Sequence, residues 1–206
     1  MPRATDLGIW AESRDTSEVW LLDLHVPAAP ARVVTPRRKE VVYHAEHART
    51  AAGDVLLLAT NDGASEFRLM SAPLATPGRE HWREVVAEGE GRRLHSVDAF
   101  AGHVVLGHRA EDSTVLTVLP ADGGEGYDVW PTSRYGTVRL DRNELFEATS
   151  ITVAEESHTE PLRWDTVDLA TGVAAASSSG RSRRTTLRST SPSGARSPRP
   201  TGRRSR

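Results

Sequence analysis

Apolar and polar positions alternate along most of the chain, in a pattern that repeats about every 48 residues. Four segments combine a polar turn with a following apolar strand, and they begin at Asp15, Asp62, Glu111 and Thr159. Val19, Phe67 and Val115 lie 48 positions apart, and the next step falls on Arg163, beside Trp164. The alternation has the period of β-strands, and helical spacing is nearly absent. The pattern therefore predicts an all-β fold made of a repeated unit.

Each repeat contains four short predicted strands. The strands that precede the polar turns cover residues 7–10, 55–58, 104–106 and 151–153. Each pairs with the next strand as a hairpin, because only a few polar residues separate the two. Two further sets of strands fill the space between hairpins, at residues 32–35, 82–87 and 127–131, and at residues 41–45, 94–100 and 137–140.

Four strands in 40–50 residues is the spacing of a β-propeller blade. A β-sandwich also has many short strands and turns, but it needs no constant repeat, so the 48-residue step favours the propeller. About 14 strands form roughly three and a half four-stranded blades, whereas closed propellers have about four to eight. We expect a partial β-propeller that begins inside a strand pair and has open sheet edges, which favour self-association.

The pattern ends at residue 172, so we predict two parts: a partial propeller over residues 1–172 and a disordered tail over residues 173–206. The segment 181–206 has nine Arg and no acidic residue, which leaves the first 180 residues with a formal charge of −11. Such a tail cannot bury a core. A nucleic-acid-binding tail is one hypothesis, but it lacks interleaved aromatic residues. We favour translation of GC-rich DNA in a wrong frame, and we predict no nucleic-acid partner.

The composition limits the class of protein and the cellular compartment that we expect. Hydrophobic residues make up 37% and charged residues 26%, which is compatible with a globular core. The chain has no Cys, so it has neither disulfides nor thiolate metal sites. Its start lacks an apolar leader, and no apolar run approaches the ~20 residues of a membrane helix. We therefore expect a cytoplasmic protein without a membrane partner.

No motif in the sequence predicts catalysis or a cofactor. The G-x-S-x-G motif of serine hydrolases is absent. Ser65 lies in a turn between strands and is interpreted as structural. His44 and His47 could suggest a metal, but on a strand they point to opposite faces, and their spacing differs from that of H-E-x-x-H. Gly123, Gly124 and Gly126 lack phosphate-loop spacing and indicate a turn. We predict no catalytic residue, no cofactor and no metal.

Two basic clusters and the tryptophans remain as candidate binding residues. The clusters are Arg37-Arg38-Lys39 and Arg92-Arg93, next to predicted strands. We interpret them as solvated blade rims; the alternative is contact with a substrate carboxylate or another domain. The five tryptophans fall in strands of different repeats and are interpreted mostly as packing anchors between blades, with a ligand platform as the alternative. They are Trp10, Trp20, Trp82, Trp130 and Trp164.

Several segments together resemble the propeller of oligopeptidase B, a member of the prolyl oligopeptidase family. They are Ser-Glu-Val-Trp-Leu-Leu-Asp at 17–23, Pro-Arg-Arg-Lys-Glu-Val-Val-Tyr at 36–43 with Glu46 and His47, Thr-Asn-Asp-Gly-Ala-Ser-Glu-Phe-Arg-Leu at 60–69, Trp-Arg-Glu-Val at 82–85, and Asp-Leu-Ala-Thr-Gly at 168–172. The resemblance extends from about residue 7 to residue 172, and the last segment is similar to the end of the family's final blade.

The resemblance implies a seven-bladed propeller that covers an α/β-hydrolase domain with a Ser, Asp and His triad. Members similar to oligopeptidase B cleave peptides after Arg or Lys, and the propeller excludes large folded proteins. No triad residue maps onto this chain. We therefore expect a non-catalytic fragment whose propeller gates short peptides toward a hydrolase domain that the chain lacks. An independent protein-interaction module is the alternative.

The resemblance also bears on the tail. GC-rich codons for residues 185–196, shifted by one base, can encode a Tyr-rich segment that ends in Ser-Glu-Arg-Arg. That product is similar to the segment after the family's last blade. A frameshift upstream of a hydrolase domain is therefore our hypothesis for the tail.

Overall fold

The computed structural model describes residues 6–26, 28–176 and 188–189, and the regular secondary structure of the described chain is almost entirely β-strand. The elements are β1 (Asp6–Glu12), β2 (Ser17–Asp23), β3 (Arg32–Val33), β4 (Tyr43–Thr50), β5 (Gly53–Thr60), β6 (Arg68–Pro73), the 3₁₀ turn η1 (Arg79–His81), β7 (Arg83–Val86), β8 (Arg93–Ala99), β9 (His103–Arg109), β10 (Thr114–Pro120), β11 (Tyr127–Val129), β12 (Thr137–Leu140), β13 (Ser150–Glu156), β14 (Arg163–Asp168), β15 (Ala174–Ala176) and β16 (Arg188–Ser189). Among the described residues, no helix is long and apolar enough to cross a bilayer.

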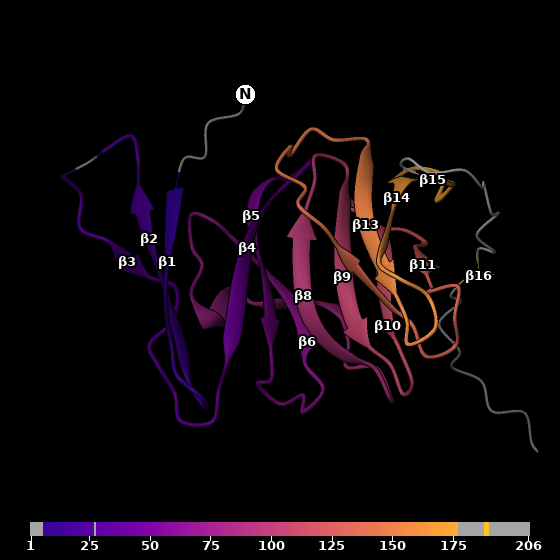
Figure 1. Cartoon of the computed structure of the whole chain (residues 1–206). Helices are drawn as coiled ribbons and strands as arrows, with labels where there is room; N and C mark the ends of the chain where they lie inside the picture. Colours follow the sequence, from indigo (N-terminus) through magenta and orange to yellow (C-terminus); the bar gives the residue numbers. More distant parts are fainter. Residues whose placement is uncertain (1–5, 27, 177–187, 190–206) are drawn as a thin grey trace, which may run out of the picture.

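The strands form four antiparallel sheets that follow one another in chain order (Figure 1). They are β1-β2-β3, β4-β5-β6-β7, β8-β9-β10-β11 with β16 at its outer edge, and β12-β13-β14-β15. Each sheet is a meander in which consecutive strands pair, as the hairpin pattern predicts. The sheets do not close into a ring, so the predicted fold class, a partial β-propeller, is confirmed.

Three apolar layers hold the four sheets together, one between each pair of neighbours. The first sheet packs on the second through a cluster that includes Val19, Leu21 and Leu58. Similar clusters join the second sheet to the third and the third to the fourth. In β5, the side chains of Leu56 and Leu58 belong to the first layer and that of Leu57 to the second. A central sheet thus buries both faces, which explains the continuous apolar runs in its middle strands.

The sheets approach one another most closely near their first strands. The principal contacts between sheets join β2 to β4, β4 and β5 to β8, and β10 to β12. The last consecutive strands of the first three sheets, β3, β7 and β11, lie away from these contacts. The sheets therefore radiate from a common side, as blades do around a propeller axis. We call the side formed by β4, β8 and β12 the inner edge of the arc.

Side-chain hydroxyls connect neighbouring sheets at two of the three layers. Ser17 Oγ donates to the Tyr43 carbonyl (2.7 Å) and accepts from the Tyr43 N–H (2.6 Å). Thr114 Oγ1 makes the same pair of bonds with Val138, both at 2.8 Å. At the middle layer the Leu94 N–H donates directly to the Glu66 carbonyl instead (3.0 Å). The hydroxyls satisfy buried backbone groups where one sheet ends and the next begins.

Tyr43 adds a further connection at the first layer. Its buried hydroxyl accepts from the Val19 N–H (2.9 Å) and donates to the Thr35 carbonyl (3.1 Å). Its ring meets that of Trp82 edge-to-face at 5.6 Å. Burial raises the pKa of this phenol above its usual value, so it stays protonated.

Two carboxyl groups lie at the middle layer. Burial, and secondarily the charge of Asp98 on β8, raise the pKa of Glu46 on β4 to about 7. Burial also raises the pKa of Asp98. Two partly buried acids close together oppose each other's ionisation. The middle layer therefore carries an electrostatic penalty at neutral and higher pH.

The structure differs from the predicted boundary at residue 172. Gly172, with φ +67°, closes a turn in which its N–H donates to the Asp168 carbonyl (2.8 Å). The chain then returns as β15, which pairs with β14 and completes the fourth sheet. Arg188 and Ser189 also pair, with β11. Backbone bonding needs no large apolar side chain, so the Ala-rich composition concealed β15. The rest of the predicted disordered tail, residues 177–187 and 190–206, lies outside the described residues.

Removing the hydroxyl of Ser17 should weaken the first layer. Ser17→Ala leaves the buried N–H and carbonyl of Tyr43 without a partner, which costs about 1–3 kcal/mol of unfolding free energy. Ser65→Ala is the matched control, since Ser65 donates only to the exposed Glu88 carboxylate. It should change stability by less than about 0.5 kcal/mol. Urea unfolding of the two variants and the parent chain measures both values, and equal losses would contradict this role for Ser17.

Glu46 should make stability fall between pH 4.5 and pH 7. Its folded pKa of about 7 exceeds the ordinary value of 4.5, so the folded state binds more protons in this range, and stability is lost as pH rises. Between pH 4.5 and pH 8, Glu46→Gln should gain about 1–3 kcal/mol relative to the parent chain. The exposed Glu125→Gln is the control. Urea unfolding at both pH values tests this, and an unchanged difference would contradict it.

Candidate functional site

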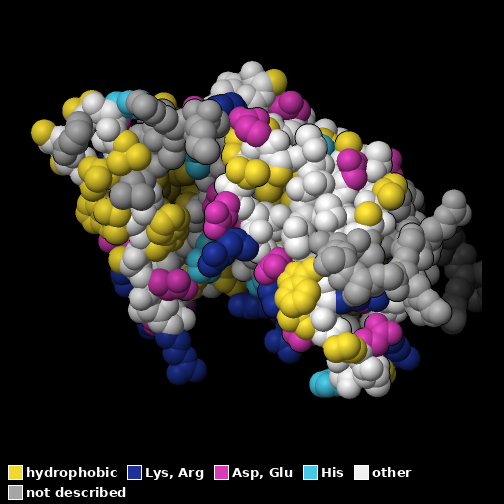
Figure 2. All heavy atoms as spheres, turned by 45° about the horizontal axis from the view of Figure 1, so that its top comes forward, with side chains coloured by type: hydrophobic (Ala, Val, Ile, Leu, Met, Phe, Trp, Pro, Cys, Tyr) yellow, Lys and Arg dark blue, Asp and Glu magenta, His cyan; other side chains and the backbone are white. Residues whose placement is uncertain are grey.

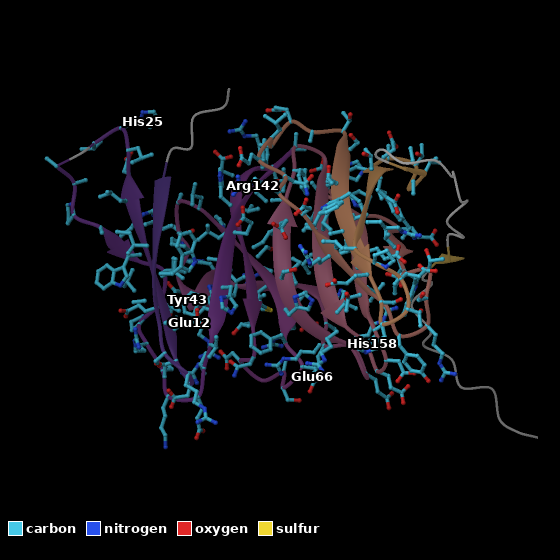
Figure 3. All side chains as sticks on the ribbon, viewed as in Figure 1. Glu12, His25, Tyr43, Glu66, Arg142 and His158 are labelled. Carbon is cyan, nitrogen blue, oxygen red and sulfur yellow. The ribbon has the colours of Figure 1, made fainter. Side chains whose placement is uncertain are left out.

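The turns and connections of the arc gather at two opposite ends. Glu12, Glu66 and His158 lie at one end, which is formed by the β1–β2, β5–β6 and β13–β14 turns (Figure 3). His25 and Arg142 lie at the opposite end (Figure 3). The inner edge runs between these two ends.

Polar and titratable side chains occupy much of the inner edge. They are His44, Glu46, His47, Arg49 and Thr50 on β4, His95, Ser96 and Asp98 on β8, and Thr137 and Arg139 on β12. His44, Arg49, His95 and Arg139 are exposed. The inner edge is thus polar, while the layers between the sheets are apolar.

Nearby groups hold several of these side chains. Arg49 Nε lies 3.2 Å from Asp54 Oδ1, and its guanidinium lies 5.9 Å from the centre of the Phe146 ring. Arg139 lies 3.9 Å from the carboxylate of Asp141. Burial, then the charge of Arg109, lower the pKa of His95 below its ordinary value, so this imidazole is neutral at pH 7. Exposed arginines on the inner-edge strands include Arg49, Arg93 and Arg139.

A cleft of about 730 Å³ opens beside the third sheet and the connection that leads to the fourth, at the same end as Glu66. It is lined by Glu90, Gly91, Arg92, Ala110, Glu111, Asp112, Ser113, Trp130, Pro131, Ser133 and Arg134. The lining comes from the connection before β8, the turn between β9 and β10, and the connection before β12.

A buried carboxylate organises one wall of the cleft. Asp128 is 1% exposed, accepts from Thr117 Oγ1 (2.7 Å), and pairs with the Arg92 guanidinium at 2.8 Å. That guanidinium lies 5.1 Å from the Trp130 ring centre. Burial, then the positive charge of Arg92, lower the pKa of the neighbouring His108 to about 4. His108 is therefore neutral at pH 7, and the Asp128–Arg92 pair carries no net charge.

The candidate residues Ser65, His44 and His47 each lie next to an acidic side chain. Ser65 donates to Glu88 Oε1 (2.9 Å) in the turn before β6. His44 lies 3.9 Å from Glu12, whereas His47, three positions along the strand, lies 3.3 Å from Asp54. Within the described residues, no three His, Cys, Asp or Glu side chains are arranged to hold a metal ion.

The two basic clusters mainly contact other parts of the chain. Arg37 donates to the Ala11 carbonyl (2.8 Å), which ties the loop before β4 to the first sheet. Arg38 pairs with Asp62 at 3.1 Å, while Lys39 remains exposed. Arg93 lies over the ring of Phe67 at 4.7 Å. These contacts join neighbouring sheets, so the clusters are more than solvated rims.

The tryptophans divide into two groups. Trp82 is buried in the first layer, as expected for a packing anchor, and Trp20 and Trp130 are partly buried. Trp10 and Trp164, in the first and fourth sheets, are 55% and 45% exposed. For these two, the interpretation as anchors between blades is wrong within this chain.

Sequence analysis missed the buried polar groups that shape the inner edge and the cleft: Glu46, Asp98, Asp128 and Tyr43. Asp128 had one detectable signal, since it lies between Tyr127 and Val129 in a predicted strand. The contacts of Tyr43 with Val19 and of Glu46 with Asp98 join residues more than 20 positions apart and have no local signature.

Comparisons with known proteins agree with this architecture. A family model described as the N-terminal β-propeller domain of prolyl oligopeptidase matches residues 7–178. The prolyl endopeptidase-like protein of Gallus gallus is 34% identical over 100 residues, covering 48% of this chain and 13% of the relative. Protease 2 of Moraxella lacunata is 27% identical over 164 residues, covering 80% of this chain and 23% of the relative.

Among solved structures, oligopeptidase B from Trypanosoma brucei, in its closed form with covalently bound antipain, matches with a TM-score of 0.75 and 20% identity. The match covers 89% of this chain and 26% of that protein. This chain thus spans about a quarter or less of the length of these relatives. With a family model matched over residues 7–178, the chain belongs to the family of prolyl oligopeptidase N-terminal β-propeller domains.

Proposed function

We propose that this chain is the access-controlling part of an oligopeptidase B-type serine peptidase and performs no catalysis by itself. Its sheets form part of the wall of a passage through which short peptides reach a hydrolase domain that this chain lacks. The observation that carries the proposal is the match of residues 7–178 to the peptidase propeller family. Short peptides are the proposed ligands.

The distribution of polar groups supports a passage along the inner edge. Peptide backbones carry one donor and one acceptor per residue, and they lose free energy when these groups stay unpaired away from water. The inner edge offers exposed polar side chains such as His44, Arg49 and Arg139. The buried clusters between the sheets consist mainly of aliphatic side chains and offer few such partners. An extended peptide can therefore pass along the inner edge but cannot enter between the sheets.

The packing of the sheets supports exclusion of folded proteins. Residues such as Leu58, Leu106 and Val105 are fully buried in the layers, and interiors of this density resist deformation. The inner edge is therefore a stiff wall of fixed position. A stiff passage selects by size, because a folded domain cannot widen it without breaking an apolar layer.

Cellular location and self-association are also proposals. We propose a cytoplasmic location, supported by the absence of cysteine from all 206 residues. Self-association is supported by the incomplete ring, whose end sheets each leave one face without a neighbouring sheet among the described strands.

The purified 206-residue chain should not hydrolyse a chromogenic arginine substrate, because no nucleophile or triad is proposed in it. Release of p-nitroaniline from benzoyl-arginine p-nitroanilide measures this. Turnover that co-purifies with the chain would overturn the assignment. Sequencing the downstream DNA in three frames is the companion test, and the lack of any encoded hydrolase domain would also contradict the proposal.

A bulkier side chain on the inner edge should slow the cleavage of long peptides more than that of short substrates. The test uses the protein that joins this propeller to the downstream hydrolase. His44→Trp adds bulk to a half-exposed inner-strand position. It should lower kcat/KM several-fold for a peptide of about ten residues, while barely affecting the one-residue arginine substrate. Val85→Trp, on the exposed outer strand β7, is the matched control and should leave the ratio of the two rates unchanged. Equal effects of both variants would contradict a passage along the inner edge.

A further inference from the structure

The connection between β12 and β13 is much longer than the equivalent turns of the two preceding sheets. In the second sheet two residues, 51–52, join the first strand to the next, and in the third sheet three residues, 100–102, do so. The same connection in the fourth sheet consists of nine residues, 141–149. Hairpin loops usually have about two to five residues, and long loops in compact domains often carry function. We call residues 141–149 the long loop.

Backbone and side-chain bonds fix both ends of the long loop to the fourth sheet. Asn143 Nδ2 donates to the Thr152 carbonyl (2.9 Å), and Asn143 Oδ1 accepts from the Thr152 N–H (2.8 Å). At the other end, the Thr149 carbonyl accepts from the Leu169 N–H (2.9 Å), and Ala148 packs against the third apolar layer. The long loop is therefore held in a defined position at its base.

The middle of the long loop reaches the two sheets that precede its own. The Phe146 carbonyl accepts from the N–H of Ala101, in the turn between β8 and β9 (2.8 Å). The Phe146 ring centre lies 5.9 Å from the guanidinium of Arg49, near the end of β4. Figure 1 shows the loop extending over the upper ends of β8 and β9, and Figure 3 places Arg142 at this end. The long loop thus runs from β12 past β8 to β4, the three strands that form the inner edge.

Several side chains of the long loop remain exposed. Leu145 is 65% exposed, and the side chains of Arg142 and Glu144, which lie 3.7 Å apart, are 85% and 74% exposed. In Figure 2, where this end comes toward the viewer, acidic and hydrophobic side chains lie next to each other at the upper middle of the molecule. Among the described residues, the buried clusters include none of these three side chains. Packing of the sheets therefore does not account for the length of the loop.

We propose that the long loop narrows one opening of the peptide passage and thereby limits the width of the peptides that enter, which presupposes the proposed function. The loop crosses the end of the inner edge, where a chain that follows this edge enters or leaves. Its bonds to Thr152, Leu169 and Ala101 keep it there as a fixed constriction. An extended peptide is the ligand that passes such a constriction most easily. A peptide closed into a ring is wider and is hindered.

Two forms of one short peptide test the constriction in the protein that joins this propeller to the downstream hydrolase. The peptide has a single arginine and a cysteine at each end; the cysteines are alkylated in the linear form and joined by a disulfide in the ring form. The parent protein should cleave the linear form with the higher kcat/KM. Replacing residues 142–147 by Gly-Gly, which tight turns accept, should reduce this preference several-fold.

The matched control replaces residues 158–161, in the β13–β14 turn at the opposite end, by Gly-Gly and should leave the preference unchanged. Leu145→Ala is a milder variant that should change the preference in the same direction, with the exposed Leu162→Ala as its control. Circular dichroism checks that each variant folds. A parent protein that cleaves both forms equally would overturn the proposed function as well. A parent that prefers the linear form, with the same preference in both long-loop variants, would overturn the role of the loop alone.

The position of the long loop can be tested in the 206-residue chain, which has no cysteine of its own. Ala101→Cys and Leu145→Cys place thiols on two exposed residues, one in the β8–β9 turn and one next to Phe146. A short bis-maleimide should link them within one chain, as detected by mass spectrometry after proteolysis. The pair Ala101→Cys and Leu162→Cys, at opposite ends of the arc, should stay unlinked. Equal linking of the two pairs, or no linking of the first, would contradict a loop held across the inner edge.

Discussion

Each central sheet of this protein must bury both of its faces, and the rest of the structure depends on that constraint. A strand such as β5 sends Leu56 and Leu58 to one neighbour and Leu57 to the other, so no sheet is stable alone. Three apolar layers result from four sheets. The layers also set the angle at which the sheets radiate, and that angle creates the inner edge.

Polar side chains form hydrogen bonds with backbone N–H and carbonyl groups that apolar packing would leave without a partner. At the first and third layers, the hydroxyls of Ser17 and Thr114 each bond both backbone groups of a residue in the next sheet. The middle layer uses a direct backbone bond and contains Glu46 and Asp98, which disfavour each other's ionisation. The three layers are therefore similar in packing but differ in electrostatics.

The arrangement of the sheets connects the fold to the two proposals. A propeller segment has an inner edge, which we propose lines a passage, and two end faces. The inner edge supports a role in peptide access, and the long loop across its end supports a limit on peptide width. Both depend on the same geometry, because the apolar layers hold the strands of the inner edge and the turn that the long loop contacts.

Much of the fold could be predicted from sequence, since it follows from local alternation. The 48-residue step, the hairpins and the four strands per blade depend on residues close in the chain, and so does the resemblance to the peptidase propeller. Strand β15 was missed, because Ala174–Ala176 pair through backbone groups and show no apolar pattern. The cleft and its Asp128–Arg92 pair could not be predicted, since 36 positions separate the two residues. Only the tertiary structure decided which tryptophans are buried, because burial depends on whether another sheet covers the strand that carries them.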